Sequence, residues 1–370
     1  MLTSETAPKK APRFGGLDLL RLLSVLGVIV YHYGYWGPAV HGATHVAIPQ
    51  LAPFAMYGYL GVSVFFTISG FVIAYSADGR TTATFAIARF SRIYPTFVLC
   101  MTLTALVTLA FGQPTFDVTL TQWLANLFVA ATVLHQPYMD SAYWSLVIEI
   151  VFYLWIALLI ATRLFPSRID LIVLAWLAIS LLNELTVDAV AIEKVFLADD
   201  SGFFATGLLL YELCRGRRDP RLYALLVLAV GTAVFQAIHK LGRLTDHGAD
   251  PQAQWTVAVI CLISIAAIAL ATRMRRTWLP AGVTLALGGL TYPLYLLHQK
   301  AGYVVLERLA PSHVIPAVIA IIAAISAISW AIWRYIEPVI HDRTKTKLMQ
   351  LAGRISSKTR LSAAASRARK

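Results

Sequence analysis

Residues 17–36, LDLLRLLSVLGVIVYHYGYW, form an apolar run long enough to cross a bilayer as a helix. Three ionisable residues interrupt this run: Asp18, Arg21 and His32. A charged residue at the centre of a membrane helix costs roughly 2.5 to 3.5 kcal/mol on insertion scales, so such residues generally face a bundle interior or a polar cavity. The segment therefore predicts both a membrane fold and a functional site.

Composition extends the membrane prediction to the whole chain. Of 370 residues, 58% are hydrophobic and 14% are charged, which leaves too little polar surface for a soluble domain. The net charge of +12 could suggest a nucleic-acid partner, but nearly a third of the basic residues follow His341 and others separate the apolar runs. Membrane topology explains that distribution, so we expect no nucleic-acid partner. The three cysteines lie in apolar runs without disulfide or zinc spacing, and no metal is predicted.

Runs of about 20 apolar residues predict an all-α, polytopic membrane helical bundle with about ten transmembrane helices. The expected spans are 17–36, 57–76, 90–111, 143–162, 169–186, 196–213, 222–239, 254–272, 281–300 and 314–335. Segment 120–134 is shorter and contains Gln122 and Asn126. It could be a span, a re-entrant segment or an interfacial helix.

Basic residues set the orientation. With ten spans and a cytoplasmic N-terminus, most arginines outside the tail fall in inner loops, as the positive-inside rule requires. An eleventh crossing through 120–134 would invert every later loop and destroy this pattern. The sequence therefore predicts a cytoplasmic N-terminal segment over 1–16, a membrane domain over 17–340 and a basic, flexible cytoplasmic tail over 341–370.

The spacing in the first span indicates a functional stripe. Asp18 and Arg21 are three residues apart, so a helix places them on one face, where they can pair. His32 lies eleven residues beyond Arg21, which is about 16 Å along the axis and close to the same face. Pairing alone would be a structural role for these residues.

Two further ionisable residues lie in apolar segments. WSLVIEIVFY puts Glu149 at membrane depth, and LTYPLYLLHQ brings His298 near the outer end of the ninth span. The alternating helix directions place His32, Glu149 and His298 in the outer half of the bilayer. A neutral imidazole can take a proton from a hydroxyl, and a carboxylate can orient it, so these residues predict a proton-transfer centre. The structural alternatives are an arginine partner for Glu149 and an interfacial packing role for His298.

Two more segments contain small or basic residues at helical spacing. GVSVFFTISGF, residues 61–71, contains small residues that allow close helix packing. In ARFSRIYPTF, Arg89 and Arg92 are three apart on one face of a helix that begins at the cytoplasmic interface. Two guanidiniums so placed make a fork for phosphate, although ordinary positive-inside anchoring would explain them as well.

Taken together, these strings resemble the acyltransferase type 3 family of integral membrane acyltransferases. The resemblance covers most of the chain and rests on five features in the family's order. They are the Arg-x10-His arrangement of Arg21 and His32 with Asp18 before it, GVSVFFTISGF, RFSR followed by IYP, WSLVIEIVFY, and LTYPLYLLHQ. Thr291 stands where a serine is frequent in the family, and this change keeps the hydroxyl.

The resemblance implies a multi-pass enzyme of the bacterial cytoplasmic (inner) membrane. Its donor would be cytoplasmic acetyl-CoA or another acyl-CoA, and its acceptor a hydroxyl of a carbohydrate, glycoside or other envelope or secreted molecule. By position, His32 would be the catalytic histidine, Arg21 its motif partner and Glu149 a required acid. Arg89 and Arg92 would bind the acyl donor. The residues predicted to support this site are Asp18, Ser69, Tyr292 and His298.

A transporter or flippase of a glycan or lipid-linked precursor is the alternative, because polar residues inside a helical bundle also mark substrate pathways. The chain shows no internal repeat that would favour it. Several features stay open at the level of sequence. They are the acceptor, acetyl against a larger acyl group, general-base against acyl-histidine chemistry, and the oligomeric state.

Overall fold

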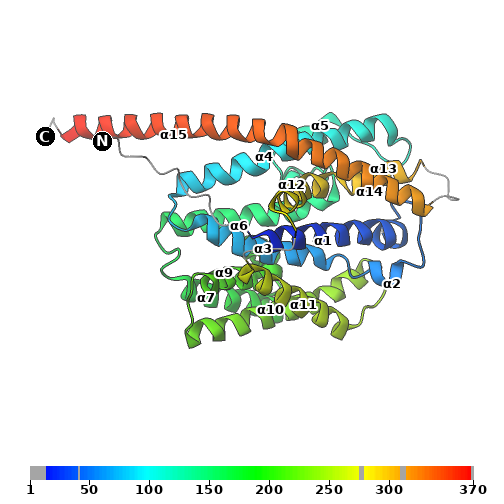
Figure 1. Ribbon diagram of the computed structural model, residues 1–370, viewed down its shortest axis with the longest axis horizontal. Helices are drawn as coiled ribbons and strands as arrows, with labels where there is room; N and C mark the ends of the chain where they lie inside the picture. The colour runs from blue at the N-terminus through cyan, green and yellow to red at the C-terminus, as the bar shows by residue number, and fades with distance from the viewer. Residues whose placement is uncertain (1–13, 41, 275–278, 309–313, 368–370) are drawn as a thin grey trace.

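The computed structural model describes residues 14–40, 42–274, 279–308 and 314–367 (Figure 1). Most of the predicted N-terminal segment, residues 1–13, lies outside these ranges. Every regular element within them is helical, so the prediction of an all-α fold is confirmed.

The elements run in the following order. They are α1 (Gly15–Tyr31), η1 (His32–Val40), α2 (Ala52–Ala55), α3 (Leu60–Ala77), α4 (Thr82–Phe111), α5 (Leu120–Asn126), η2 (Ala131–Leu134), η3 (Ser141–Tyr143), α6 (Trp144–Ala161), α7 (Ile169–Leu182), η4 (Asn183–Val187), α8 (Val190–Phe196), η5 (Ala198–Asp200), α9 (Ser201–Cys214), α10 (Pro220–Asp246), α11 (Gln254–Arg273), α12 (Ala281–Leu297), α13 (Lys300–Leu306), α14 (Val314–Ala331), η7 (Ile332–Ile336) and α15 (Glu337–Arg367).

In the described part of the chain, eight helices are long and apolar enough to cross a membrane. They cover 15–40, 52–77, 82–111, 141–161, 169–187, 220–246, 254–273 and 314–354. The sixth and ninth expected spans correspond to shorter helices, α9 with 14 residues and α12 with 17. A multi-pass membrane protein is therefore supported, whereas the count of ten and the orientation of the termini stay predictions.

Glycines allow the central helices to approach closely. A Cβ atom at Gly70 of α3 would lie 2.3 Å from the carbonyl oxygen of Phe204, and one at Gly207 of α9 would lie 2.1 Å from that of Thr67. The two backbones are therefore in contact, which only residues without a side chain permit. The close packing predicted for Gly70 is confirmed, and α9 is buried from Ser201 to Leu213.

Segment 120–134 is not a spanning helix. It forms two short helices, α5 and η2, whose polar side chains tie them to the following loop. The side-chain oxygen of Asn126 accepts a hydrogen bond from the backbone amide of Met139 at 2.8 Å. The side-chain amide of Gln122 donates to the backbone carbonyl of Tyr138 at 3.1 Å. The sequence-based decision to leave this segment out of the span count agrees with this structure.

The expectation of a flexible tail over 341–370 stays a prediction, and the structure describes a helix over most of this segment. Helix α15 continues directly from η7 and is helical to Arg367, packing along α4 and projecting past the end of the bundle (Figure 1). The tail is rich in Ala, Lys and Arg, which favour helices, and it extends an existing helix without a new nucleation step. Its cytoplasmic location stays a prediction.

Helix α4 begins earlier than the expected span at residue 90. Thr81 caps it, because its hydroxyl accepts a hydrogen bond from the Thr84 amide at 3.3 Å. Arg89 therefore lies seven residues into α4, about 10 Å along the axis, and Arg92 one turn further. The early start places both arginines beyond the first turn of the helix, where Arg89 is half-buried and Arg92 is exposed.

Candidate active site

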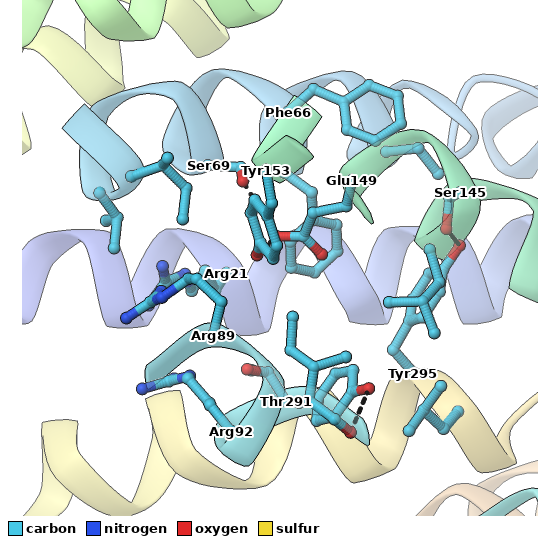
Figure 2. Close-up of a pocket in the computed structure, with 18 of the residues that line it drawn as sticks. Arg21, Phe66, Ser69, Arg89, Arg92, Ser145, Glu149, Tyr153, Thr291 and Tyr295 are labelled. Carbon is cyan, nitrogen blue, oxygen red and sulfur yellow. Dashed lines mark hydrogen bonds between the residues drawn. The ribbon is translucent and has the colours of Figure 1, made fainter. Parts of the chain in front are cut away.

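A cavity of about 130 Å³ lies between α1, α3, α4, α6 and α12, and we call it the arginine cavity (Figure 2). Its lining residues are Arg21, Val62, Phe65, Phe66, Ser69, Val72, Ile73, Arg89, Arg92, Ile93, Ser145, Leu146, Glu149, Tyr153, Gly288, Thr291, Tyr292, Tyr295 and Leu296. Six residues predicted for the site therefore share one cavity, drawn from five helices that are distant in sequence.

Positive charge dominates the arginine cavity. Arg21, Arg89 and Arg92 gather at one end, whereas Glu149 is the one carboxylate among the lining residues (Figure 2). Among the described residues, the buried Nε atom of Arg89 has no hydrogen-bond partner. An excess of guanidinium groups with an unused donor suits a phosphate-bearing anion.

Hydrogen bonds fix the carboxylate of Glu149 within this cavity. Its Oε1 atom accepts from the hydroxyl of Ser69 at 2.9 Å and from the hydroxyl of Tyr153. Glu149 and Ser69, each predicted for the site, are therefore in direct contact, whereas Glu149 does not share a cavity with His32. Glu149 lies five residues into α6, about 7.5 Å along its axis, while His32 follows the end of α1.

Asp18 lies behind the arginine cavity. Its Oδ1 atom is 3.5 Å from Nη1 of Arg21, which confirms the predicted pairing in the first span. A Cβ atom at Gly288 of α12 would lie 2.3 Å from the same Asp18 oxygen, so α1 and α12 cross here at close range. This crossing brings the end of α1 alongside the end of α12.

His32 and His298 meet at those two helix ends. The Nδ1 atom of His32 is 3.1 Å from the Nε2 atom of His298, and the rings are nearly parallel, with planes at 14° and centroids 5.0 Å apart. His32 is also the first residue of the π-helical segment η1, and π-helical turns are frequent at functional sites. His298 is fully buried.

The hydrogen bonds determine which nitrogen of His32 is protonated. The Nδ1 atom of His298 lies 2.7 Å from the backbone carbonyl of Tyr295, which can only accept, so this Nδ1 carries a proton. In neutral His298 the Nε2 atom is then the acceptor, and the hydrogen must come from Nδ1 of His32. The lone pair of neutral His32 is therefore on Nε2, which makes Nε2 the basic atom of this ring.

Residues missed by the sequence analysis hold the His298 segment in place. The buried carboxylate of Asp140 accepts from the Lys300 amide at 2.8 Å and from the Ala142 amide at 2.9 Å, and the hydroxyl of Tyr33 donates to the His298 carbonyl. Asp directly before the short helix η3 is a helix-capping pattern that could have indicated Asp140. Its contact with Lys300 spans 160 residues and had no local signal.

A second cavity, of about 610 Å³, has His32 among its lining residues, and we call it the aromatic chamber. Its lining residues are Val28, Tyr31, His32, Trp36, Tyr59, Val62, Ser63, Ser141, Trp144, Ile148, Glu193, Lys194, Leu197, Asp199, Asp200, Lys240, Arg243, Leu244, His247, Tyr295 and Gln299. Two residues, Val62 and Tyr295, line both cavities and form their common wall.

Tyr295 is held firmly in that wall. Its hydroxyl lies 2.7 Å from the hydroxyl of Ser145 and donates to the Ala142 carbonyl at 3.2 Å. The Ser145–Tyr295 pair occupies the end of the arginine cavity opposite the guanidiniums (Figure 2). A ligand that reached from the arginines to His32 would have to pass this pair.

The predicted residues therefore divide between two places. Arg21, Ser69, Arg89, Arg92, Glu149 and Tyr292 line the arginine cavity, while His32 lines the aromatic chamber with His298 behind it. Their catalytic and binding roles stay predictions. Within the described ranges, no group of three or more His, Cys, Asp or Glu residues is placed to hold a metal ion.

Comparisons with known proteins point to one family. The family model described as "Acyltransferase domain" matches residues 14–334. Acyltransferase MdmB from Streptomyces mycarofaciens is 28% identical over 158 residues, which cover 40% of this chain and 39% of that protein. The chain thus spans about two fifths of the length of this curated relative. No solved structure matches the chain.

Proposed function

We propose that this chain, which belongs to the acyltransferase family whose domain model matches residues 14–334, is an O-acyltransferase of the bacterial cytoplasmic membrane. It moves an acyl group, acetyl in the simplest case, from a cytoplasmic acyl-CoA to a hydroxyl of a carbohydrate or other envelope or secreted acceptor. The observation that carries this proposal is the His32–His298 contact at the aromatic chamber, because it leaves a basic nitrogen beside a cavity.

The arginine cavity supports an acyl-CoA donor. Coenzyme A carries phosphates at one end and the thioester at the end of a long flexible arm. Arg89 and Arg92 bind the phosphates, with Arg21 beside them, and the arm extends toward Tyr295 and His32. Glu149, bonded to Ser69, keeps the guanidiniums from repelling one another by placing one negative charge among them. A cavity closed by apolar helices also limits hydrolysis of the thioester.

In the general-base route, His32 acts on the acceptor. Its Nε2 atom removes the hydroxyl proton as the oxygen attacks the thioester carbonyl, the carbon–sulfur bond breaks, and the thiolate receives that proton from the imidazolium. The products are an ester and the free thiol of coenzyme A. His298 keeps Nδ1 of His32 protonated and so acts as a positioning residue.

In the acyl-histidine route, the same Nε2 attacks the thioester and the thiolate leaves. The acceptor hydroxyl then attacks the acyl-imidazole and its proton passes to the thiolate or to solvent. The two routes differ in one measurement. Acyl-histidine formation releases a burst of about one equivalent of free thiol per enzyme without acceptor, whereas direct transfer releases none.

The test is acyl-CoA turnover by purified protein in detergent with a mixture of envelope glycans as acceptors. His32→Ala is expected to lower transfer by about 10²- to 10⁴-fold, because a general base contributes that much. His135→Ala is the matched control, since His135 is exposed and lines neither cavity. Equal turnover in folded His32→Ala contradicts the proposal, and glycan movement across vesicles without acyl-CoA consumption favours a transporter.

A further inference from the structure

One wall of the aromatic chamber is made of ring side chains. Tyr31 stacks on Trp36, with centroids 5.6 Å apart and planes at 26°, and lies 5.7 Å from the ring of Tyr59. Trp36 is partly exposed, and Trp144 is 42% exposed on the same chamber. Flat rings that are apolar on their faces and polar at their edges suit a ligand with one apolar face and a polar rim.

A second part of the lining of the aromatic chamber is charged but balanced. It comes from α8, η5 and the end of α10, and its charged residues are Glu193, Lys194, Asp199, Asp200, Lys240 and Arg243. The three acids and three bases are paired with one another. Lys240 bonds Asp200, Arg243 bonds Asp199 and lies 3.6 Å from Glu193, and Lys194 bonds Glu193. Their formal charges sum to zero, so this wall offers many hydrogen-bonding groups without attracting ions of either sign.

Gln299 adds an unused acceptor to the same chamber. Gln299 lies beside Tyr303, whose hydroxyl donates to the His32 carbonyl at 3.2 Å. The Oε1 atom of Gln299 is buried and has no hydrogen-bond partner among the described residues, and Gln299 as a whole is only 4% exposed. A buried acceptor left without a donor is unfavourable, so this oxygen favours a ligand that carries a hydroxyl or N–H group.

The position of Gln299 links the ligand to the chemistry. It directly follows His298, which fixes the tautomer of His32, and both Gln299 and His32 line the chamber. A ring bound through one hydroxyl at Gln299 would bring a neighbouring hydroxyl toward Nε2 of His32. The same ring could lay its apolar face on Trp36 and direct its other hydroxyls at the paired charges.

We infer that the aromatic chamber is the acceptor site and that it binds an uncharged, polyhydroxylated ring, a neutral glycoside, with Gln299 accepting a hydrogen bond from one of its hydroxyls. This inference rests on the proposed acyl transfer. It narrows the acceptor class, since the balanced wall disfavours rings that carry a carboxylate, phosphate or ammonium group. The chamber volume of about 610 Å³ accommodates one or two sugar rings.

The experiment uses the full chain in detergent and three matched probes: methyl glucoside, methyl glucuronide and methyl glucosaminide, which are neutral, anionic and cationic. Binding is followed by tryptophan fluorescence, and Trp36→Phe identifies the part of the signal that comes from the chamber. Saturable quenching by the neutral probe is expected, with affinity about tenfold or more above that for either charged probe. Equal affinities, or no quenching by any probe, overturn the inference.

Gln299→Met tests the hydrogen bond itself. It removes the acceptor at nearly constant volume and is expected to weaken binding of the neutral probe about tenfold or more. Tyr303→Phe is the matched control, because it removes the neighbouring hydroxyl that bonds the His32 carbonyl but leaves Oε1 of Gln299 in place. An equal loss of binding in both variants shows that the ligand does not depend on Oε1 itself, and overturns the assignment of Gln299.

Acyl-CoA turnover, measured in parallel, separates this inference from the proposed function. If no acceptor supports turnover while the neutral probe still binds and Gln299→Met weakens it, the binding site stands and the acyl-transfer proposal fails. If turnover occurs but the KM for the acceptor is the same in Gln299→Met as in the wild type, and the same for neutral and charged acceptors, acyl transfer stands and the inference fails.

Discussion

The two cavities of this protein share a wall but differ in charge. The arginine cavity sets three guanidiniums against the single carboxylate of Glu149 among its lining residues, and the Nε atom of Arg89 is unused in the described structure. The aromatic chamber contains three acids and three bases that pair with each other. One cavity is therefore suited to an anion and the other to an uncharged polar ligand.

The difference shows how a membrane bundle can treat two ligands differently within a short distance. Charges inside a bilayer are costly unless they are paired or face a polar ligand. The aromatic chamber meets that condition with its own ion pairs, whereas in the arginine cavity Arg21 pairs with Asp18 but the buried Nε atom of Arg89 has no hydrogen-bond partner among the described residues. Val62 and Tyr295 are the boundary between the two environments, and His32 lies on the chamber side of it.

The largest effect is expected at the contact between His32 and His298. His298→Ala removes the acceptor for Nδ1 of His32 and frees its tautomer, so kcat should fall by about 10²-fold or more while the KM for acyl-CoA stays near that of the wild type. His298→Gln should recover part of kcat, because its amide oxygen can accept the same hydrogen bond. A kcat within a few-fold of wild type in His298→Ala would show that His32 does not depend on it.

The arginine cavity is tested next. Arg89→Gln and Arg92→Gln should each raise the KM for acyl-CoA by about 10- to 100-fold, since a hydrogen bond to a charged group contributes about 1.5 to 3 kcal/mol. The acceptor KM should not change. Arg80→Gln is the control, because Arg80 is exposed and lines neither cavity. A rise in the KM for the acceptor alone would show that the arginine cavity binds the acceptor and not acyl-CoA.

A smaller effect is expected from unbalancing the aromatic chamber. Asp199→Asn removes one partner of Arg243 and gives the wall a net positive charge. The affinity for methyl glucuronide should then rise about two- to fivefold, as expected for a pair that is partly screened by solvent, while methyl glucoside binding stays nearly constant. If the two probes respond alike, charge balance is not what selects the ligand.

The smallest effect is expected outside both cavities. Burial would raise the pKa of Glu307, but hydrogen bonds from Thr44 and His45 hold it below the ordinary value. The stability contributed by this group is therefore present above about pH 4.5 and is lost as the pH falls through the lowered pKa. Glu307→Gln should lower Tm by about 2 °C or less at pH 7 and reduce its decline in acid, with both KM values unchanged. A shift in either KM would connect this outer contact to a cavity.

Much of the fold follows from local sequence properties. Hydropathy over windows of about 20 residues identifies spanning helices because the bilayer requires apolar side chains along the whole segment. The tail shows the limit of such local analysis. Its polar composition suggested flexibility, whereas helix propensity and continuity with α14 make residues 341–367 helical.

The sequence predicted individual residues of the site but not how they are arranged in space. Arg89, Arg92, Glu149 and Ser69 were expected to matter, and they do share a cavity. The placement of His32, Glu149 and His298 in the outer half of the bilayer stays a prediction. Gln299 ends the string LTYPLYLLHQ but was not singled out in it, and its proposed role rests on an oxygen without a partner among the described residues.

Spacing within single helices was enough to predict the helical membrane fold, the Asp18–Arg21 pair and the strings that resemble the family. The contact of His32 with His298 across 266 residues, and the division of the polar residues between the arginine cavity and the aromatic chamber, arise only in the folded chain. The physical reason is that contacts between helices depend on where each helix begins and how closely it crosses its neighbours. Glycines such as Gly288 and the buried carboxylate of Asp140 set those crossings and helix ends only once the chain is folded.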